Sequence, residues 1–251
     1  MSRVLVSNDH ASPFIVYVPG ITGTGALSNQ FLQQTQQSFN LTQLHFPGHS
    51  RLTLEELADG CVNALAEQGR RKAIWMGESF GSAIALLIAL RHPSAVEGLV
   101  LASGLTKMSS PSRLMMAARI WDSSPDAWRK NFLRKRLNRL ARRCSGRLSK
   151  SQIDNFLING QMDFVSWRLR LLASFDVRQQ LTRIGVPTLY LGGEEDTLVD
   201  TQEEAKILRE SLESVRTFLF PRCGHAILAE RPEESLDILA NFLPLARRVA
   251  A

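Results

Sequence analysis

Alternation between short apolar runs and helical patterns constrains the fold of this chain more than any other feature. Residues 14–18 are continuously apolar and end at Pro-Gly, as expected of a strand buried on both faces. The pattern predicts further strands at residues 41–46, 73–76, 97–102, 187–191 and 215–220, and helices at residues 27–38, 53–68, 80–91, 202–212 and 232–242. Strands that alternate with helices predict an α/β fold, with a mostly parallel central sheet flanked by helices.

The strand pattern is absent from residues 105–181. Apolar residues recur there at helical spacing over residues 128–140, 152–158 and 167–172, and Lys and Arg fill the opposite faces. The sequence therefore predicts a helical insertion, residues 105–181, between the two parts of one α/β domain, residues 1–104 and 182–251.

Positive charge is concentrated in this insertion. The whole chain has 30 Lys+Arg and 24 Asp+Glu, a formal charge of +6. Residues 106–181 alone hold 16 basic and 5 acidic residues, so they carry +11 and the rest of the chain −5. A basic amphipathic helix can bind an acidic carrier protein or an anionic membrane surface, or it can be a solvated face. No nucleic acid is expected as a partner, because no recognition motif accompanies the charge. The densest run comprises Arg129, Lys130, Arg134, Lys135, Arg136, Arg139, Arg142 and Arg143.

Composition narrows the class of protein. With 44% hydrophobic and 22% charged residues, the chain has the composition of a folded globular protein. Its longest apolar run, residues 83–90, is far shorter than a spanning helix, and its N-terminus lacks the apolar stretch of a secretory signal. We expect a soluble cytoplasmic protein. The three cysteines are widely spaced, which argues against a disulfide framework and a zinc site.

A serine lies at a predicted sharp turn between a strand and a helix. The run Gly77-Glu78-Ser79-Phe80-Gly81 has the pattern G-x-S-x-G, with an apolar strand before it and an apolar helix after it. Small residues on either side allow the backbone to fold back, so the Ser79 hydroxyl stands clear at the carboxyl edge of the sheet. This context predicts a nucleophile, although a glycine-rich turn with an incidental serine would give the same five residues.

A serine hydroxyl needs a base, and the base needs an orienting acid. Asp196 follows the strand predicted at residues 187–191, and His225 follows the strand predicted at residues 215–220. All three side chains are therefore expected at one edge of the sheet, in the order Ser, Asp, His. Glu194, Glu195 and Asp200 remain alternative acids. The other histidines, of which only His49 is expected near the site, are His10, His45, His49 and His92.

Acyl transfer also needs hydrogen-bond donors for the oxyanion. The Phe80 amide, which directly follows the nucleophile, is one predicted donor. The other is the amide of Ile21 in the glycine-rich loop after the first strand, with Thr22 as the alternative. The same loop is no phosphate-binding loop, because Ala26-Leu27 stands where Lys-Ser/Thr is required.

These motifs resemble the α/β-hydrolase superfamily over nearly the whole chain. The resemblance implies an α/β-hydrolase fold, with residues 105–181 as a helical cap that selects the substrate. Parts of residues 17–25, 77–81 and 201–205 are also similar to the hydrolase half of phytyl-ester-synthase-like esterase/acyltransferases. Apolar residues that could line an acyl pocket, or form the core of the cap, are Met108, Leu114, Met115, Met116, Trp121, Trp128, Phe132, Phe156, Phe164 and Trp167.

The sequence thus predicts a serine hydrolase that cleaves small carboxylic esters through Ser79, His225 and Asp196. An acyl-enzyme intermediate forms and is resolved by water, and no metal or organic cofactor is needed. Two other hypotheses remain. The same residues could serve an acyl thioesterase or acyltransferase, or the chain could be a binding module that keeps the fold without catalysis.

Overall fold

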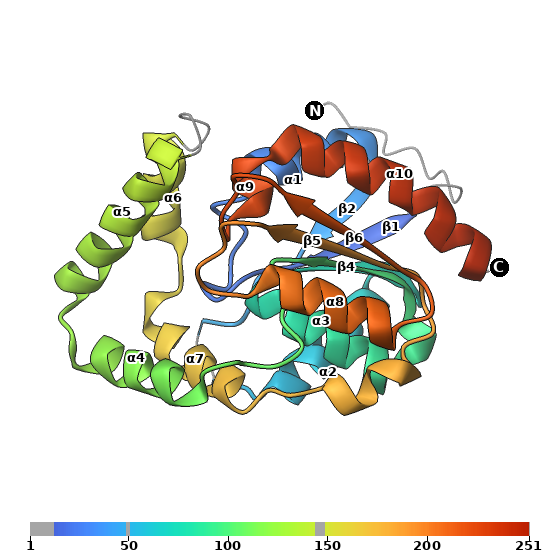
Figure 1. The fold of residues 1–251 in the computed structure, drawn as a ribbon, viewed down its shortest axis with the longest axis horizontal. Coiled ribbons are helices and arrows are strands. Elements are labelled where there is room, and N and C mark those ends of the chain that lie inside the picture. Colours follow the sequence, from blue (N-terminus) through green and yellow to red (C-terminus); the bar gives the residue numbers. More distant parts are fainter. Residues whose placement is uncertain (1–12, 49–50, 144–148, 251) are drawn as a thin grey trace.

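Parallel strands form the centre of the molecule (Figure 1). The computed structural model describes residues 13–48, 51–143 and 149–250, and of residues 140–143 and 244–250 it describes only the backbone. Within these residues six strands pair in the order β2-β1-β3-β4-β5-β6, and every pair is parallel. The strands are β1 (Phe14–Val18), β2 (Asn40–Gln43), β3 (Ala73–Glu78), β4 (Val96–Ala102), β5 (Thr188–Gly193) and β6 (Val215–Phe220). The predicted α/β fold is therefore confirmed.

Helices cover both faces of the sheet (Figure 1). One face packs on α2 (Leu54–Glu67), α3 (Phe80–Arg91) and α8 (Thr201–Ser211). The other packs on α1 (Asn29–Ser38), the short α9 (Ile227–Glu230) and α10 (Pro232–Ala250). Because alternate residues of a strand point to opposite faces, Val16 and Trp75 belong to the first core and Ile15 and Ile74 to the second.

The central helix α3 is apolar on all sides. Residues 80–90 are all buried, since the helix lies between the sheet and α2. Its neighbour α2 is capped by Thr53, where the predicted capping box with Glu56 is present. Both helices therefore begin where the sequence pattern predicts. Because α3 begins at Phe80, Ser79 lies at the turn directly before the helix.

The insertion between β4 and β5 is helical. It contains α4 (Pro111–Ser123), α5 (Asp126–Arg143), α6 (Lys150–Asn159) and α7 (Val165–Ala173), which project from one side of the sheet (Figure 1). Short 3-10 helices lie at Pro93–Ala95, Met162–Phe164 and Arg178–Arg183. None of the helices described is long and apolar enough to cross a membrane.

Three elements differ from the sequence pattern. Strand β2 ends at Gln43 rather than at residue 46, because the Phe46 amide turns to bond the Gly23 carbonyl. Helix α10 continues to Ala250, past the apolar pattern that suggested an end at Phe242. The insertion has its first helix, α4, where no separate helix was predicted.

Candidate active site

Ser79 forms the sharp turn between β3 and α3. Its backbone has φ 53° and ψ −114°, a left-handed conformation that residues other than glycine rarely adopt. The Ser79 amide donates to the Ala102 carbonyl at 2.8 Å, which ties the turn to β4. Backbone strain of this kind is held in place by the structure around it and concentrates at functional sites.

Two glycines make room for the turn. A Cβ atom on Gly77 would lie 2.4 Å from the Gly81 carbonyl oxygen, and one on Gly81 would lie 2.1 Å from the Val18 carbonyl oxygen. Both distances are far below van der Waals contact, and the obstructing atoms belong to the backbone. The glycines of G-x-S-x-G are therefore required by the packing of β1, β3 and α3.

Ser79, His225 and Asp196 form a chain of hydrogen bonds at the carboxyl edge of the sheet. His225 Nε2 lies 2.8 Å from Ser79 Oγ, and His225 Nδ1 lies 2.7 Å from Asp196 Oδ2. These distances match those required of a nucleophile, a general base and an orienting acid. The structure thus brings together the three residues that the sequence places in the site.

Asp196 is fixed on both of its oxygens. Oδ1 accepts from the amides of Leu198 at 2.8 Å and Val199 at 3.1 Å, and none of the side chain is exposed. Of the alternative acids, Asp200 caps α8 by accepting from the Glu203 amide. Glu194 and Glu195 are exposed. Asp196 is therefore the carboxylate that faces His225.

Two buried residues that the sequence does not predict hold the His225 loop. Glu230 accepts from the amides on either side of His225, from Gly224 at 2.8 Å and Ala226 at 3.0 Å. Ser103 Oγ donates to the His225 carbonyl at 2.7 Å. Glu230 lies in the four-residue helix α9, where no periodicity marks it. For Ser103, the only feature of the sequence that could have indicated a role is its position directly after β4.

The loop predicted to supply an oxyanion donor lies beside Ser79. A Cβ atom on Gly20 would be 3.9 Å from the Ser79 Cβ. The Gly23 amide donates to the Gly20 carbonyl at 2.9 Å, which closes a β-turn with Ile21 and Thr22 at its centre. Phe80 is the first residue of α3, so its amide has no partner within the helix. Ile21 thus follows a residue that lies beside Ser79, and Phe80 directly follows Ser79.

Glu78, directly before Ser79, is a buried carboxyl group. It accepts hydrogen bonds from Tyr17 Oη of β1 and from Ser28 Oγ at the start of α1. Burial raises the pKa of Glu78 and, together with the neighbouring Glu78 charge, raises that of Tyr17. In sequence, Glu78 is one of the two variable positions of G-x-S-x-G, and nothing there indicates that it joins β1, α1 and the turn.

The remaining histidines and cysteines lie elsewhere. His92 pairs with Asp59 at 2.7 Å and His45 is exposed, while His10, His49 and Cys144 lie outside the described residues. Cys61 and Cys223 are buried, and burial raises the pKa of Cys61 to about 12. Within the residues that the structure describes, no group of three His, Cys, Asp or Glu could hold a metal ion.

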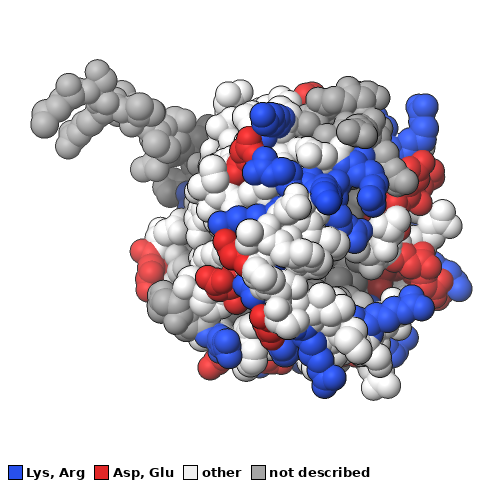
Figure 2. Space-filling model, turned by 90° about the vertical axis from the view of Figure 1, so that its left-hand side faces the viewer, with Lys and Arg blue, Asp and Glu red and all other residues white. Residues whose placement is uncertain are grey.

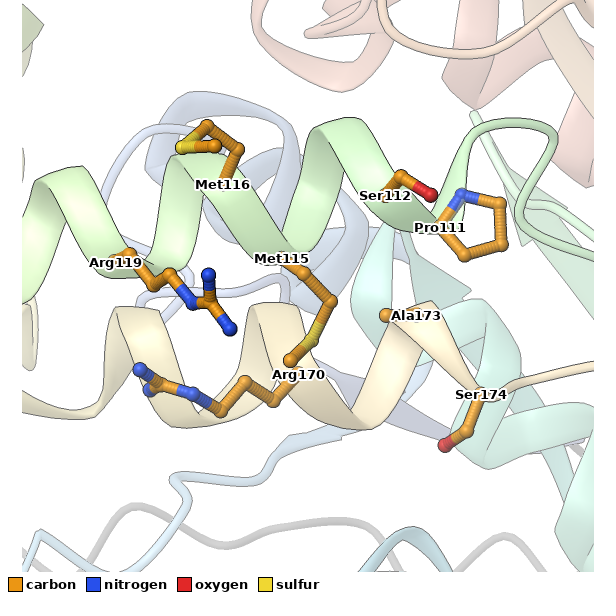
Figure 3. Close-up of a pocket in the computed structure, with 8 residues that line it drawn as sticks. All are labelled: Pro111, Ser112, Met115, Met116, Arg119, Arg170, Ala173 and Ser174. Atoms are coloured by element: carbon orange, nitrogen blue, oxygen red, sulfur yellow. The ribbon is translucent and has the colours of Figure 1, made fainter.

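Apolar residues of the insertion take three different positions. Trp121 belongs to its core with Leu137 and Met162, as the packing alternative predicts. Trp128 and Phe132 stack on each other at 5.2 Å and are exposed. The third position is a groove of about 680 Å³ between α4 and α7, of which Ser79 is not a lining residue. It is lined by Pro111, Ser112, Met115, Met116, Arg119, Arg170, Ala173 and Ser174 (Figure 3).

Comparisons with known proteins agree with this geometry. The family described as serine aminopeptidase, S33, matches residues 45–232. A pimeloyl-acyl-carrier-protein methyl ester esterase of Nitrosomonas europaea is 26% identical over 250 residues, covering 93% of this chain and 97% of that protein. The mouse sn-1-specific diacylglycerol lipase ABHD11 is 24% identical over 268 residues, covering 97% of this chain and 85% of that protein.

Solved structures share the fold. A hydrolase of Pseudomonas aeruginosa matches with a TM-score of 0.79 at 20% identity, covering 92% of this chain and 90% of that one. An enol-lactonase of Burkholderia xenovorans matches with a TM-score of 0.79 at 17% identity, covering 93% of this chain and 92% of that one. Because the sequence identities are this low, these structures show only that the fold is shared.

The fold and the relatives define the chain as an α/β-hydrolase of the serine hydrolase class and as an ester hydrolase. It belongs to the family described as serine aminopeptidase, S33, whose match spans most of the chain. The narrower resemblance to phytyl-ester-synthase-like esterase/acyltransferases stays a prediction.

Proposed function

We propose that the chain hydrolyses carboxylic esters through Ser79, His225 and Asp196, with an acyl-enzyme intermediate. The observation that carries this proposal is the unbroken chain of hydrogen bonds from Ser79 Oγ to His225 and from His225 to Asp196. The left-handed turn at Ser79 supports it, because that conformation exposes the hydroxyl at the end of β3.

Each residue has a distinct role in the reaction. Ser79 Oγ attacks the acyl carbon of the ester while His225 Nε2 takes its proton, and Asp196 holds the imidazole in the required tautomer. The tetrahedral oxyanion is stabilised by the amides of Ile21 and Phe80. When it collapses, the C–O bond to the alcohol breaks and His225 protonates the leaving alkoxide. Water, deprotonated by His225, then attacks the acyl-enzyme and releases the acid and Ser79.

Labelling and turnover test the nucleophile together. A fluorophosphonate probe should label wild type at Ser79 and leave Ser79→Ala unlabelled. Hydrolysis of p-nitrophenyl esters should fall by at least about 1,000-fold in Ser79→Ala. Ser112→Ala, which removes a serine in the groove between α4 and α7, is the matched control and should behave as wild type. Hydrolysis by Ser79→Ala at the wild-type rate would instead favour a binding module without Ser79 chemistry.

Substrate length and class follow from the same assay. Esters of increasing acyl length give the chain-length profile, and acyl-CoA in place of the p-nitrophenyl ester tests the thioesterase alternative. We expect turnover of the esters to exceed that of the thioesters. The opposite ranking would assign the same three residues to a thioesterase.

The insertion, residues 105–181, is proposed to be the cap of a core formed by residues 1–104 and 182–251. It has its own cluster of buried residues, including Trp121, Leu137 and Ile153, and this cluster also packs against Ile21 beside the nucleophile. A segment in this position can contribute directly to the substrate site, as cap segments of this fold do.

Lys and Arg side chains gather on the side of the molecule that carries the insertion, with Asp and Glu among them (Figure 2). Part of the basic run of α5 is paired with carboxylates. Arg129, Lys130 and Arg134 are neutralised by Asp163, Asp126 and Asp154, respectively. Within the described part of the chain, no carboxylate pairs with the cations that make up the free basic face of α5, namely Lys135, Arg136 and Arg139. The side chains of Arg142 and Arg143 lie outside the described residues.

We propose that this free basic face binds an acidic carrier protein that presents the acyl ester. The exposed pair Trp128 and Phe132 adjoins it, and Arg136 lies over the Phe132 ring at 5.9 Å. Aromatic residues and arginine are enriched at protein interfaces. The relatives named as acyl-carrier-protein methyl ester esterases, which the chain matches over most of its length, support the same choice.

Reversing the charge of the free basic face tests whether it binds a carrier protein or a membrane. Lys135→Glu/Arg139→Glu should raise KM for a carrier-bound acyl methyl ester by about 10-fold or more and leave p-nitrophenyl ester hydrolysis unchanged. Lys206→Glu/Arg209→Glu on α8 makes the same change of charge elsewhere and is the control. Unchanged KM for the carrier-bound ester would refute carrier binding. If the variant instead lost co-sedimentation with anionic lipid vesicles, the face would be a membrane-binding surface.

A further inference from the structure

Arg168 is a buried cation on α7 that the reaction as proposed does not use. Only 3% of its surface is exposed, and its guanidinium lies over the rings of Phe46 at 5.1 Å and Phe164 at 5.5 Å. No carboxylate pairs with it among the residues described. Burial lowers its pKa to about 10, so it remains charged at neutral pH. A buried charge without a counter-ion costs free energy, so its hydrogen bonds are the feature to explain.

Those hydrogen bonds run to the loop beside Ser79. Arg168 Nη1 donates to the Ile21 carbonyl at 2.9 Å, and Nη2 donates to Gln161 Oε1. The backbone N–H of Gln161 in turn donates to the Thr22 carbonyl at 2.9 Å. Two consecutive carbonyl groups of the loop are therefore held by the insertion.

The peptide that Arg168 holds is the central one of a β-turn. Gly20 and Gly23 close this turn, so the peptide between Ile21 and Thr22 lies at its middle. The central peptide of a β-turn has two alternative orientations, which differ by a flip that exchanges the positions of its C=O and N–H groups. In a trans peptide these two groups point in opposite directions. Arg168 selects the orientation in which the Ile21 carbonyl faces α7.

We propose that Arg168 is a positioning residue for the oxyanion hole. By holding the Ile21 carbonyl toward the insertion, it keeps that oxygen away from the developing oxyanion and leaves the Thr22 N–H, on the opposite side of the same peptide, to face the substrate. Without this bond the central peptide can flip and place a partial negative charge where the reaction needs a donor. The inference rests on the proposed function, because it requires that this turn supplies an oxyanion donor, and the peptide that Arg168 holds carries the Thr22 amide, the alternative to that of Ile21.

The test replaces Arg168 and compares it with a neighbour on the same helix. Arg170 also lies on α7, but it pairs with Asp122 and lines the groove toward α4, beside Arg119 (Figure 3). Arg168→Met should lower kcat for a p-nitrophenyl ester by about 10- to 100-fold and leave KM within about 3-fold. Arg170→Met should keep both values within about 2-fold of wild type.

Inhibition by an alkylboronic acid distinguishes positioning from a general structural role. Its tetrahedral adduct with Ser79 places an oxygen in the oxyanion hole, so its Ki should rise in Arg168→Met by the same factor by which kcat falls. A product carboxylic acid, which forms no such adduct, should bind as to wild type. If kcat is unchanged in Arg168→Met, or if both inhibitors weaken equally, the inference is wrong.

Two further variants complete the test. If Arg168→Met does not fold, Arg168→Lys takes its place, because lysine cannot reproduce the two-acceptor fork. It should lose about 3- to 10-fold in kcat, and wild-type kcat would overturn the inference. Ser79→Ala in the same assay tests the proposed function separately: an active Ser79→Ala refutes that function, whereas an inactive one with unaffected Arg168 variants refutes only the role of Arg168.

Discussion

Glu204 of α8 predicts how the stability of this fold depends on pH. The residue is 7% exposed, and its Oε2 accepts from the Thr106 amide at 2.8 Å. Burial raises its pKa from the ordinary 4.5 to about 7, against the opposing effects of the Thr106 hydrogen bonds and the charge of Arg178. Because the folded state then binds this proton more tightly than the unfolded state, the free energy of unfolding falls as the pH rises between these two values.

The size of the effect follows from the shift. Each pKa unit corresponds to 1.36 kcal/mol, so a rise from 4.5 to about 7 makes ionised Glu204 destabilising by about 3 kcal/mol above pH 7. Glu204→Gln removes the titration and keeps an acceptor for the Thr106 amide. We therefore expect the stability of the variant relative to wild type to increase by about 3 kcal/mol on going from below pH 4.5 to above pH 7.

Urea unfolding, followed by the fluorescence of the four tryptophans, of which Trp75 is fully buried, measures this difference at several pH values. Glu203→Gln removes one charge at an exposed position of the same helix and is the matched control, expected to show no comparable dependence. A difference between Glu204→Gln and wild type that stays constant across this pH range would refute the assignment of the raised pKa to burial of Glu204.

Three further predictions concern the site. Gly81→Ala should destabilise the fold by more than about 3 kcal/mol in urea unfolding, because its Cβ atom would overlap the Val18 carbonyl; Gly60→Ala, where a Cβ atom meets nothing within 4 Å, should be tolerated, and equal effects would contradict the packing argument. Asp196→Asn should lower kcat by about 10,000-fold with little change in Tm, and a loss below about 10-fold would argue against its orienting role. Glu230→Gln should lower the stability by about 1–3 kcal/mol, since one of the two amides it accepts from would face an NH2 group; an unchanged Tm would contradict this.

Local patterns in the sequence are enough to predict the elements around Ser79. The apolar run that forms β1 and the apolar helix α3 appear at the predicted residues, because both are buried on all sides and carry no competing polar pattern. The turn at Ser79 follows from the same local signal, since glycine spacing and the strand-to-helix change coincide there. The order of Asp196 and His225 along the chain adds the remaining two residues of the hydrogen-bonded chain.

Sequence patterns could not predict which charged residues are buried or paired, because these properties depend on the folded structure. Glu78, Arg168 and Glu230 are charged residues in buried positions, and a sequence pattern assigns such residues to the surface. For two of them a partner lies far away along the chain, Tyr17 for Glu78 and Ile21 for Arg168, whereas Glu230 bonds two amides close to it in sequence. The charge of α5 cannot be interpreted from sequence either, because only the structure shows that Arg134 pairs with Asp154, whereas Lys135 pairs with no carboxylate among the described residues.

The contacts around residues 20–23 place a condition on how the insertion can move. The carbonyls of Ile21 and Thr22 are held by Arg168 and Gln161, and that of Gly23 is held by the Phe46 amide. A displacement of the whole insertion would break the first two bonds together and free the peptide beside Ser79. On the proposed role of Arg168, residues 161–168 therefore stay in place while the reaction proceeds, even where other parts of the insertion move to admit a substrate.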